Sequence, residues 1–369
     1  MAATFLTGEE LLYENDLHVT STSLKTGPST AASTSSHHPG VLPGALRLRT
    51  GLKLRAAQWT DLGPVAQLIL DVCTSDGDET MAVPPEELRG EWETPGFNLE
   101  TDAWVVTTAD GRVVGYEEFF NRYAHASLQG DGYVHSDFMG NGIGTAMLHA
   151  LEERARKEME LAEPEQRVFI RNGMAIGDTV SREMHEAEGY KPIRFFWRME
   201  IILDGTPPIP TWPDGIELRP FDLDAHTYLV YRAHGEAFSD HWGHTPRSFE
   251  EWKHNTTEGE NFDPSLWFIA WDGDQIAGYT LNRFRNGKGW VGTLGIRRPW
   301  RKRGLGLALL YHSFGEFYKR GMPVISLGVD AANPTGATRL YQKAGMHVAA
   351  EYVSYEKELR PGLEPDEED

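Results

Sequence analysis

Cysteine and long apolar segments are nearly absent from this 369-residue chain, whose single cysteine is Cys73. One thiol cannot form an intramolecular disulfide or a thiolate metal cluster, and we expect no bound metal. No apolar run approaches the roughly 18 residues that cross a bilayer. The first residues also lack the basic and apolar regions of a secretory signal. We therefore expect a protein of the cytoplasm that has no membrane as partner.

Basic residues are also few, with 35 lysines and arginines against 55 aspartates and glutamates, for a formal net charge of −20. An acidic surface of this size repels nucleic acid and anionic lipid and attracts cations. We therefore expect no nucleic acid as partner. The chain is longer than one compact domain usually is, and its length indicates two domains.

The two ends of the chain have compositions that do not support a packed core. The leader, 1–46, contains a run rich in Ser, Thr, Pro and His, and the tail, 361–369, is rich in Asp and Glu. Such segments bury too little apolar area to offset the entropy lost on ordering, so we predict disorder in both. His37 and His38 have no Cys or acidic neighbours, which favours a solvated tail over a metal site.

Between these ends the sequence repeats itself, with four short landmarks in the same order in two halves. Equivalent residues are separated by 156 to 164 positions. The landmark pairs are Leu54-Arg55 and Leu218-Arg219, Gly115-Tyr116 and Gly278-Tyr279, Gly142-Ile143-Gly144 and Gly304-Leu305-Gly306, and Glu188-Gly189-Tyr190 and Ala344-Gly345-Met346. We infer a duplication into an N-terminal half, 47–203, and a C-terminal half, 212–360, which are joined by a proline-rich linker, 204–211.

Each half gives the same coarse prediction of secondary structure. A strand and one or two helices precede a β-hairpin, whose strands meet at Asp110-Gly111 in one half and at Asp272-Gly273 in the other. A glycine turn then begins a helix, and in the C-terminal half apolar residues follow at helical spacing from Leu307 to Phe317. A strand, a short helix and closing strands come last. The predicted fold class is α+β, with a mixed sheet.

The segment most informative about chemistry is Thr293–Gly306, in which a strand, a turn and two glycines lead into a helix. Amides at a helix start attract anions, and glycines let an anion approach the backbone closely. Basic residues within 297–303 add positive charge, so the segment predicts a pyrophosphate cradle. A solvated basic face and a nucleic-acid patch are the alternatives. The pattern matches neither the dinucleotide fingerprint nor a Walker loop.

Arg301, Gly304 and Gly306 match the R/Q-x-x-G-x-G/A signature of the GNAT N-acetyltransferases. The segment from Asn333 through Tyr341 resembles the next motif of that family, in which an Asn begins a helix bearing Leu-Tyr. The C-terminal half resembles the family well and the N-terminal half loosely. The resemblance implies two tandem GNAT-like domains, each a mixed, mostly antiparallel twisted sheet flanked by helices, with acetyl-CoA as co-substrate.

The resemblance also implies roles for residues of the C-terminal half. The backbone of Leu294, Gly295 and Ile296 would pair with the pantetheine arm, and Asn333 would contact the same arm. Tyr341 would stand near the thioester sulfur, where a phenol can protonate the leaving thiolate. Packing in the core is the alternative for this tyrosine. The amides expected to hold the pyrophosphate are those of Arg301, Lys302, Arg303, Gly304, Leu305 and Gly306.

The N-terminal half departs from the family signature. Met139 occupies the Arg/Gln position, Asn141 replaces a basic residue, and His185 stands where the other half has Tyr341. Asp137 adds a negative charge that disfavours a pyrophosphate. We interpret this half as a degenerate structural lobe, with or without bound CoA, and not as a second active site.

The family implies that an amine of a small molecule or peptide attacks the thioester directly in a ternary complex. The C-terminal half has no cysteine, which excludes an acyl-cysteine intermediate there. Candidate bases or amine-binding groups are Glu236, Asp240 and His241, with helix capping as the alternative for this segment. The tandem arrangement, which permits a monomer, resembles that of mycothiol synthase, so acetylation of a cysteinyl amine is a second hypothesis. A protein that binds CoA without catalysis is a third.

Overall fold

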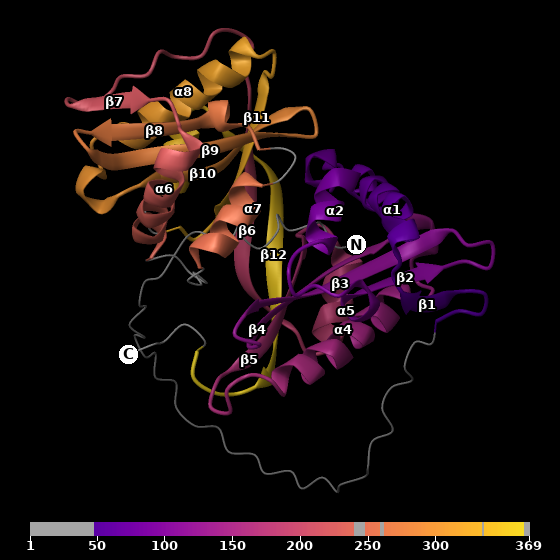
Figure 1. Ribbon diagram of the computed structural model, residues 1–369. Helices are drawn as coiled ribbons and strands as arrows, with labels where there is room; N and C mark the ends of the chain where they lie inside the picture. The colour runs from indigo at the N-terminus through magenta and orange to yellow at the C-terminus, as the bar shows by residue number, and fades with distance from the viewer. Residues whose placement is uncertain (1–47, 240–247, 259–261, 334–335, 365–369) are drawn as a thin grey trace, which may run out of the picture.

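The computed structural model describes residues 48–239, 248–258, 262–333 and 336–364 (Figure 1). In the N-terminal half the elements are β1 (Lys53–Ala56), α1 (Leu62–Ser75), α2 (Pro85–Trp92), α3 (Leu99–Asp102), β2 (Ala103–Thr107), β3 (Val113–Tyr123), β4 (Ser127–Val134), α4 (Ile143–Met159), β5 (Val168–Ala175), α5 (Thr179–Ala187) and β6 (Lys191–Ile202). In the C-terminal half they are β7 (Ile216–Arg219), α6 (Leu223–Phe238), α7 (Phe249–Thr257), β8 (Trp267–Asp272), β9 (Gln275–Arg285), β10 (Lys288–Ile296), α8 (Leu305–Lys319), β11 (Val324–Asp330), α9 (Ala337–Lys343) and β12 (His347–Arg360).

The strands of the described residues form one twelve-stranded sheet, in the order β1-β2-β3-β4-β5-β12-β6-β11-β10-β9-β8-β7. Among neighbouring strands, β4 and β5 are parallel, as are β10 and β11. The other neighbours are antiparallel. The predicted α+β class and the mixed, mostly antiparallel sheet flanked by helices are confirmed.

The two predicted hairpins are present as β2–β3 and β8–β9, both antiparallel. Each turns at an Asp-Gly pair, where Gly111 and Gly273 have φ values of 88° and 56°. A positive φ strains residues that carry a Cβ but not glycine, which explains a glycine at this position in both halves.

The two halves exchange their last strands, which the sequence analysis did not predict. β6 pairs with β11 of the C-terminal half over residues 196–202, and β12 pairs with β5 of the N-terminal half over residues 352–360. β6 and β12 also pair with each other and run through the middle of the molecule (Figure 1). The predicted linker, 204–211, lies between β6 and β7, but the sheet continues from one half to the other. The exact domain limits stay a prediction.

Helices cover both faces of the sheet in each half. On β3 the consecutive residues Gly115 and Tyr116 point to opposite faces, because strand side chains alternate. Gly115 lies under α4, while the Tyr116 hydroxyl accepts a 2.8 Å hydrogen bond from Trp92 Nε1 of α2. In the C-terminal half, Gly289 lies against Phe317 of α8, and Tyr279 contacts α6 on the other face.

The chain ends differ partly from the prediction. The leader, 1–46, lies outside the described residues, as do His37 and His38. The predicted disorder of the tail is wrong for its first residues. Leu363 pairs with the backbone of 165–167 through hydrogen bonds of 2.8 and 2.6 Å, and Arg167 lies 3.3 Å from the Glu364 carboxylate. Within the described residues, no helix is long and apolar enough to cross a membrane.

Candidate active site

The parallel strands β10 and β11 separate shortly after they meet. β10 pairs with β11 only at Gly289 and Trp290, whereas it stays paired with β9 as far as Ile296. A register shift between Val291 and Thr293 accompanies the separation, as is common where a bulge bends a strand. We call this divergence the β10–β11 opening. Beside it, the edge of β10 from 291 to 296 has no β11 partner and can pair with an extended ligand.

Leu294, Gly295 and Ile296, the residues predicted to contact the pantetheine arm, end β10 beside this opening. Gly295 lacks a side chain for a packing reason, because the Tyr279 ring occupies the place of its missing Cβ. The Tyr279 hydroxyl lies 3.0 Å from His234 Nδ1 of α6, and both side chains are buried. Sequence analysis missed this pair, although Gly278-Tyr279 is one of the repeat landmarks.

The glycine loop of the C-terminal half, Arg297–Gly304, connects β10 to α8. Lys302 and Gly304 have φ values of 62° and 88°, in the left-handed region. Lys302, Arg303 and Gly304 are exposed, and a Cβ on Gly304 would point into open space. Because the first amides of α8 have no acceptor within the helix, the loop forms a positively charged backbone cradle that fits a diphosphate.

Gly306 also has a packing role, which the sequence analysis did not predict. Its Cβ would lie 3.1 Å from Leu340 of α9, so its absence lets α8 and α9 pack closely. Leu305, between the two glycines, is buried in the core. Of the two signature glycines, Gly304 is therefore the one whose conformation shapes the loop, and Gly306 serves helix packing.

Arginines of the glycine loop bind other parts of the protein. Arg301 donates hydrogen bonds of 3.0 and 2.9 Å to the carbonyl oxygens of Ile296 and Ala237. The Arg301 side chain thereby joins the end of β10 to the end of α6. Arg297 binds the Glu236 carboxylate at 2.7 Å. This ion pair places the candidate base Glu236 beside the loop, with one carboxylate oxygen engaged.

The remaining predicted site residues lie on the β11 side of the opening or outside the described residues. Asn333 follows β11 and donates its backbone N–H to the Asp330 carbonyl at 3.2 Å. Tyr341, on α9, is 5% exposed and packs in a core cluster of the C-terminal half. Its burial agrees with the packing alternative, and its role in proton transfer stays a prediction. Asp240 and His241 fall in the segment 240–247, which is not described.

The N-terminal half repeats the backbone of this loop with other side chains. Gly140 and Gly142, at the places of Lys302 and Gly304, have φ values of 73° and 75°. Asn141 donates a 2.9 Å hydrogen bond to a carbonyl of its own loop. Asp137 is exposed beside these residues, and Met139 offers no donor at the place of Arg301.

The β4–β5 pair in the N-terminal half also stays closed for longer. These strands pair at four positions, from Ser127 to Gly130. By the repeat spacing, β10 and β11 pair only at the first two equivalent positions. The edge of β4 that an extended ligand could use is therefore shorter.

The N-terminal half also contains buried titratable groups with shifted pKa values. His185, at the place of Tyr341, lies 2.8 Å from the Ser181 carbonyl through Nδ1, and burial lowers its pKa to about 4. This histidine is therefore neutral at pH 7. On β3, burial raises the pKa of Glu117 to about 8, and the negative charge of Glu118 contributes. Burial raises the pKa of Glu118 to about 8 as well, with Asp131 contributing.

Comparison with known proteins identifies the family of this chain. The sequence profile of the acetyltransferase (GNAT) family matches residues 71–173 and 227–346. A solved GCN5-related N-acetyltransferase from Sphaerobacter thermophilus is 40% identical, with a TM-score of 0.74, over 86% of this chain and 99% of its own. The chain belongs to the GNAT family.

Two further proteins resemble this GNAT chain along most of its length. A mycothiol acetyltransferase from Thermomonospora curvata is 28% identical over 254 residues, which are 68% of this chain and 81% of that protein. A tandem GNAT protein from the clavulanic acid biosynthesis pathway shares the fold, with a TM-score of 0.63 and 17% identity over 84% of this chain and 99% of its own. The predicted tandem GNAT architecture is confirmed, and this GNAT protein is an acyltransferase that uses acetyl-CoA.

Proposed function

We propose that the C-terminal half acetylates an amine of a small molecule, with acetyl-CoA held along β10 and across the glycine loop. The difference between the two loops carries this proposal. Both have glycines in the left-handed region, but only the C-terminal loop exposes basic side chains, among them Lys302 and Arg303. The edge of β10 at 294–296 is assigned to the pantetheine arm, and the amides of 301–306 to the diphosphate. Asn333, beside the opening, is assigned to the same arm.

The reaction is proposed to be a direct attack of the amine in a ternary complex. Acetyl-CoA, when bound, supplies the acetyl group as an activated thioester. The protein must then bind the amine, remove its proton and protonate the departing sulfur. We assign the last role to the Tyr341 phenol. The candidates for removing the amine proton are Glu236, through the oxygen that Arg297 leaves free, Asp240, His241 and the His234–Tyr279 pair.

A cationic acceptor fits the charge of the chain. The formal net charge is −20, and the exposed basic residues Lys302 and Arg303 of the glycine loop are assigned to the cofactor, so the rest of the surface is more acidic still. Such a surface raises the local concentration of cations. The relatives named mycothiol acetyltransferase favour a second candidate, in which the acceptor is a cysteinyl amine. A cytoplasmic location is part of the same proposal.

Release of the CoA thiol across a panel of amines tests this function. A cationic amine should be turned over, and its kcat/KM should fall as salt rises, because screening weakens the attraction. An anionic amine of matched size should react more slowly. Preference for the anionic amine would contradict the cationic acceptor, and turnover confined to a cysteinyl amine would favour the second candidate.

A further inference from the structure

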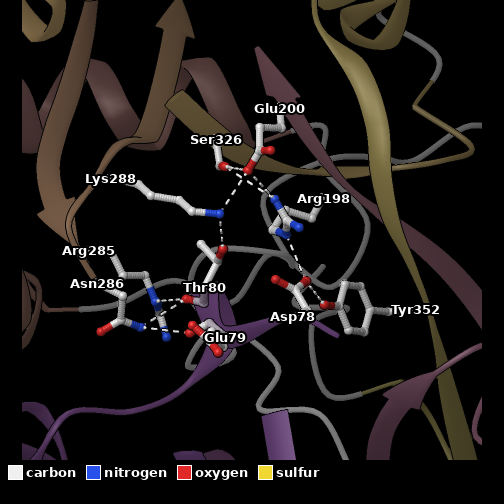
Figure 2. Close-up of polar contacts among 10 residues, drawn as sticks. All are labelled: Asp78, Glu79, Thr80, Arg198, Glu200, Arg285, Asn286, Lys288, Ser326 and Tyr352. Carbon is white, nitrogen blue, oxygen red and sulfur yellow. Dashed lines mark hydrogen bonds and ion pairs between the residues drawn. The ribbon is translucent and has the colours of Figure 1, made fainter. Parts of the chain in front are cut away.

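Buried and half-buried polar groups surround the point at which β10 and β11 begin to separate (Figure 2). Glu200 Oε2 of β6 accepts hydrogen bonds from Lys288 Nζ of β10 at 3.1 Å and from Ser326 Oγ of β11 at 3.0 Å. Arg198 of β6 donates to the same oxygen at 2.8 Å. Ser326 is opposite Trp290, the last residue of β10 that pairs with β11. One carboxylate oxygen therefore links both strands of the β10–β11 opening where the opening begins.

The N-terminal half completes this cluster with residues that follow α1. Thr80 Oγ1 accepts a 2.7 Å hydrogen bond from Lys288 Nζ. Asp78 Oδ2 accepts hydrogen bonds of 2.7 Å from Arg198 Nε and of 2.5 Å from the Tyr352 hydroxyl. Figure 2 shows these side chains converging from elements of both halves. The start of β10 is thus connected to the N-terminal half through charged hydrogen bonds, which are stronger than neutral ones.

The turn between β9 and β10 is held by the same segment of the N-terminal half. Arg285 Nε donates to the Thr80 carbonyl at 3.1 Å, and Asn286 Nδ2 donates to the Ala82 carbonyl at 2.7 Å. Thr80 is 1% exposed and Arg285 is 3% exposed. Water competes little for hydrogen bonds at this depth, so a shift of the segment moves the start of β10.

The charges of the cluster are balanced. Burial by itself would raise the pKa of Glu200, but the hydrogen bond from Lys288 and the charge of Arg198 hold that pKa below its ordinary value. Glu200 is therefore ionised at neutral pH. With Asp78 it provides two carboxylates for the two cations, Lys288 and Arg198.

The equivalent place in the N-terminal half is apolar. By the repeat spacing, Ala126 stands for Lys288 and Ile170 stands for Ser326, and both are fully buried. There β4 and β5 stay paired two residues further, to Gly130. The polar cluster therefore accompanies the earlier separation of strands in the C-terminal half.

We propose that Asp78, Thr80, Arg198, Glu200, Lys288 and Ser326, the vertex cluster, form a positioning device through which the N-terminal half sets the width of the β10–β11 opening. This inference rests on the proposed acetyl-CoA site. The cluster acts through the first residues of β10 and β11, and the cofactor-binding residues follow further along β10. The N-terminal half thereby contributes to the affinity of the C-terminal half for acetyl-CoA without itself binding acetyl-CoA.

Calorimetric titration of the full chain with acetyl-CoA tests the vertex cluster. Lys288→Met and the nearly isosteric Thr80→Val should each raise the Kd about tenfold, as expected for loss of a charged hydrogen bond. kcat at saturating acetyl-CoA should change less than about twofold, because the reacting groups are intact. Thr80→Ser keeps the hydroxyl and should restore the Kd.

Lys357→Met is the matched control. Lys357 of β12 also donates to a carboxylate of the other half, Glu152 of α4, at 2.7 Å, but away from the opening. The Lys357→Met variant should lower the unfolding temperature as Lys288→Met does, and it should leave the Kd of acetyl-CoA unchanged. An equal rise in Kd in the control, or a Kd within about twofold of wild type in both cluster variants, would overturn the inference. If Gly304→Val leaves binding intact, the proposed site fails as well. If Gly304→Val weakens binding strongly and the cluster variants do not change it, only this inference fails.

Discussion

The glycine loops of the two halves share a backbone and differ in their side chains. Gly142 and Gly304 each precede a helix, with φ values of 75° and 88°. Before them, Gly140 and Lys302 are also left-handed, at 73° and 62°. The shape of the loop has thus persisted in both copies, because it depends on local backbone conformation. Its charge has not, and under the proposed function only the loop with exposed basic side chains, among them Lys302 and Arg303, binds the diphosphate.

The cores of the two halves differ as well. Glu117 and Glu118 are 4% exposed on β3, at positions where the landmark spacing puts Thr280 and Leu281 in the C-terminal half. A buried carboxyl is costly when ionised, so burial favours its protonated form. The N-terminal core therefore has a pH dependence that the neutral residues of the C-terminal core lack at these positions.

Loss of the Tyr341 hydroxyl should give the largest difference in activity between substitutions in the two halves. Tyr341→Phe should lower kcat by about 10²–10⁴-fold, the usual contribution of a general acid, and leave the Kd of acetyl-CoA nearly unchanged. His185→Phe, at the equivalent place, should leave kcat unchanged. Steady-state kinetics and calorimetry measure the two effects. A fall in kcat below about twofold for Tyr341→Phe would assign this residue to packing alone.

Adding a side chain to each loop glycine should give the next largest contrast. Gly304→Val strains a left-handed residue and blocks the cradle, so acetyl-CoA affinity should fall about 100-fold, equal to ~2.7 kcal/mol. Gly142→Val introduces similar strain in the other loop. Calorimetry should show no comparable loss for Gly142→Val. Equal losses would mean that both halves bind acetyl-CoA alike.

Substitutions at the signature position, Arg301 in one half and Met139 in the other, should give a smaller contrast. Arg301→Met leaves the carbonyls of Ile296 and Ala237 without this donor, so the end of β10 should loosen and the Kd of acetyl-CoA should rise about tenfold. Met139→Arg should not improve binding by the N-terminal half, because β4 and β5 stay paired to Gly130. A gain from Met139→Arg would show that charge alone separates the two loops.

The last contrast concerns stability against pH and leaves acetyl-CoA binding and turnover aside. The pKa of Glu117 is about 8 in the folded protein, above its ordinary value of 4.5. The folded state therefore binds the proton more tightly, and the stabilisation, complete below pH 4.5, is lost as pH rises to 8. The loss is at most about 1.4 kcal/mol per pH unit, or about 3 °C in unfolding temperature. Glu117→Gln should make the decline measured between pH 5 and 8 less steep, with the contribution of Glu118 remaining, and an unchanged slope would contradict the assignment.

Turns and motifs were predictable because their geometry is local. Both Asp-Gly hairpins and both glycine-initiated helices lie where the repeat spacing predicts them. The family signature at Arg301 and Gly304 likewise concentrates its information in neighbouring residues. The ordered start of the tail was not predictable, because Leu363 pairs with a segment that lies far away in the sequence.

By itself, the sequence determined the duplication, the α+β class and the family, since each follows from short motifs whose own residues are neighbours in the chain. Only the tertiary structure decided that β6 and β12 cross between the halves, that Glu236 binds Arg297, and that Thr80 reaches Lys288. The backbone hydrogen bonds of a strand have the same geometry whichever strand supplies the partner groups. A local sequence pattern therefore does not predict which strand will be the neighbour. Burial of side chains from distant segments makes that choice, and it exists only in the folded molecule.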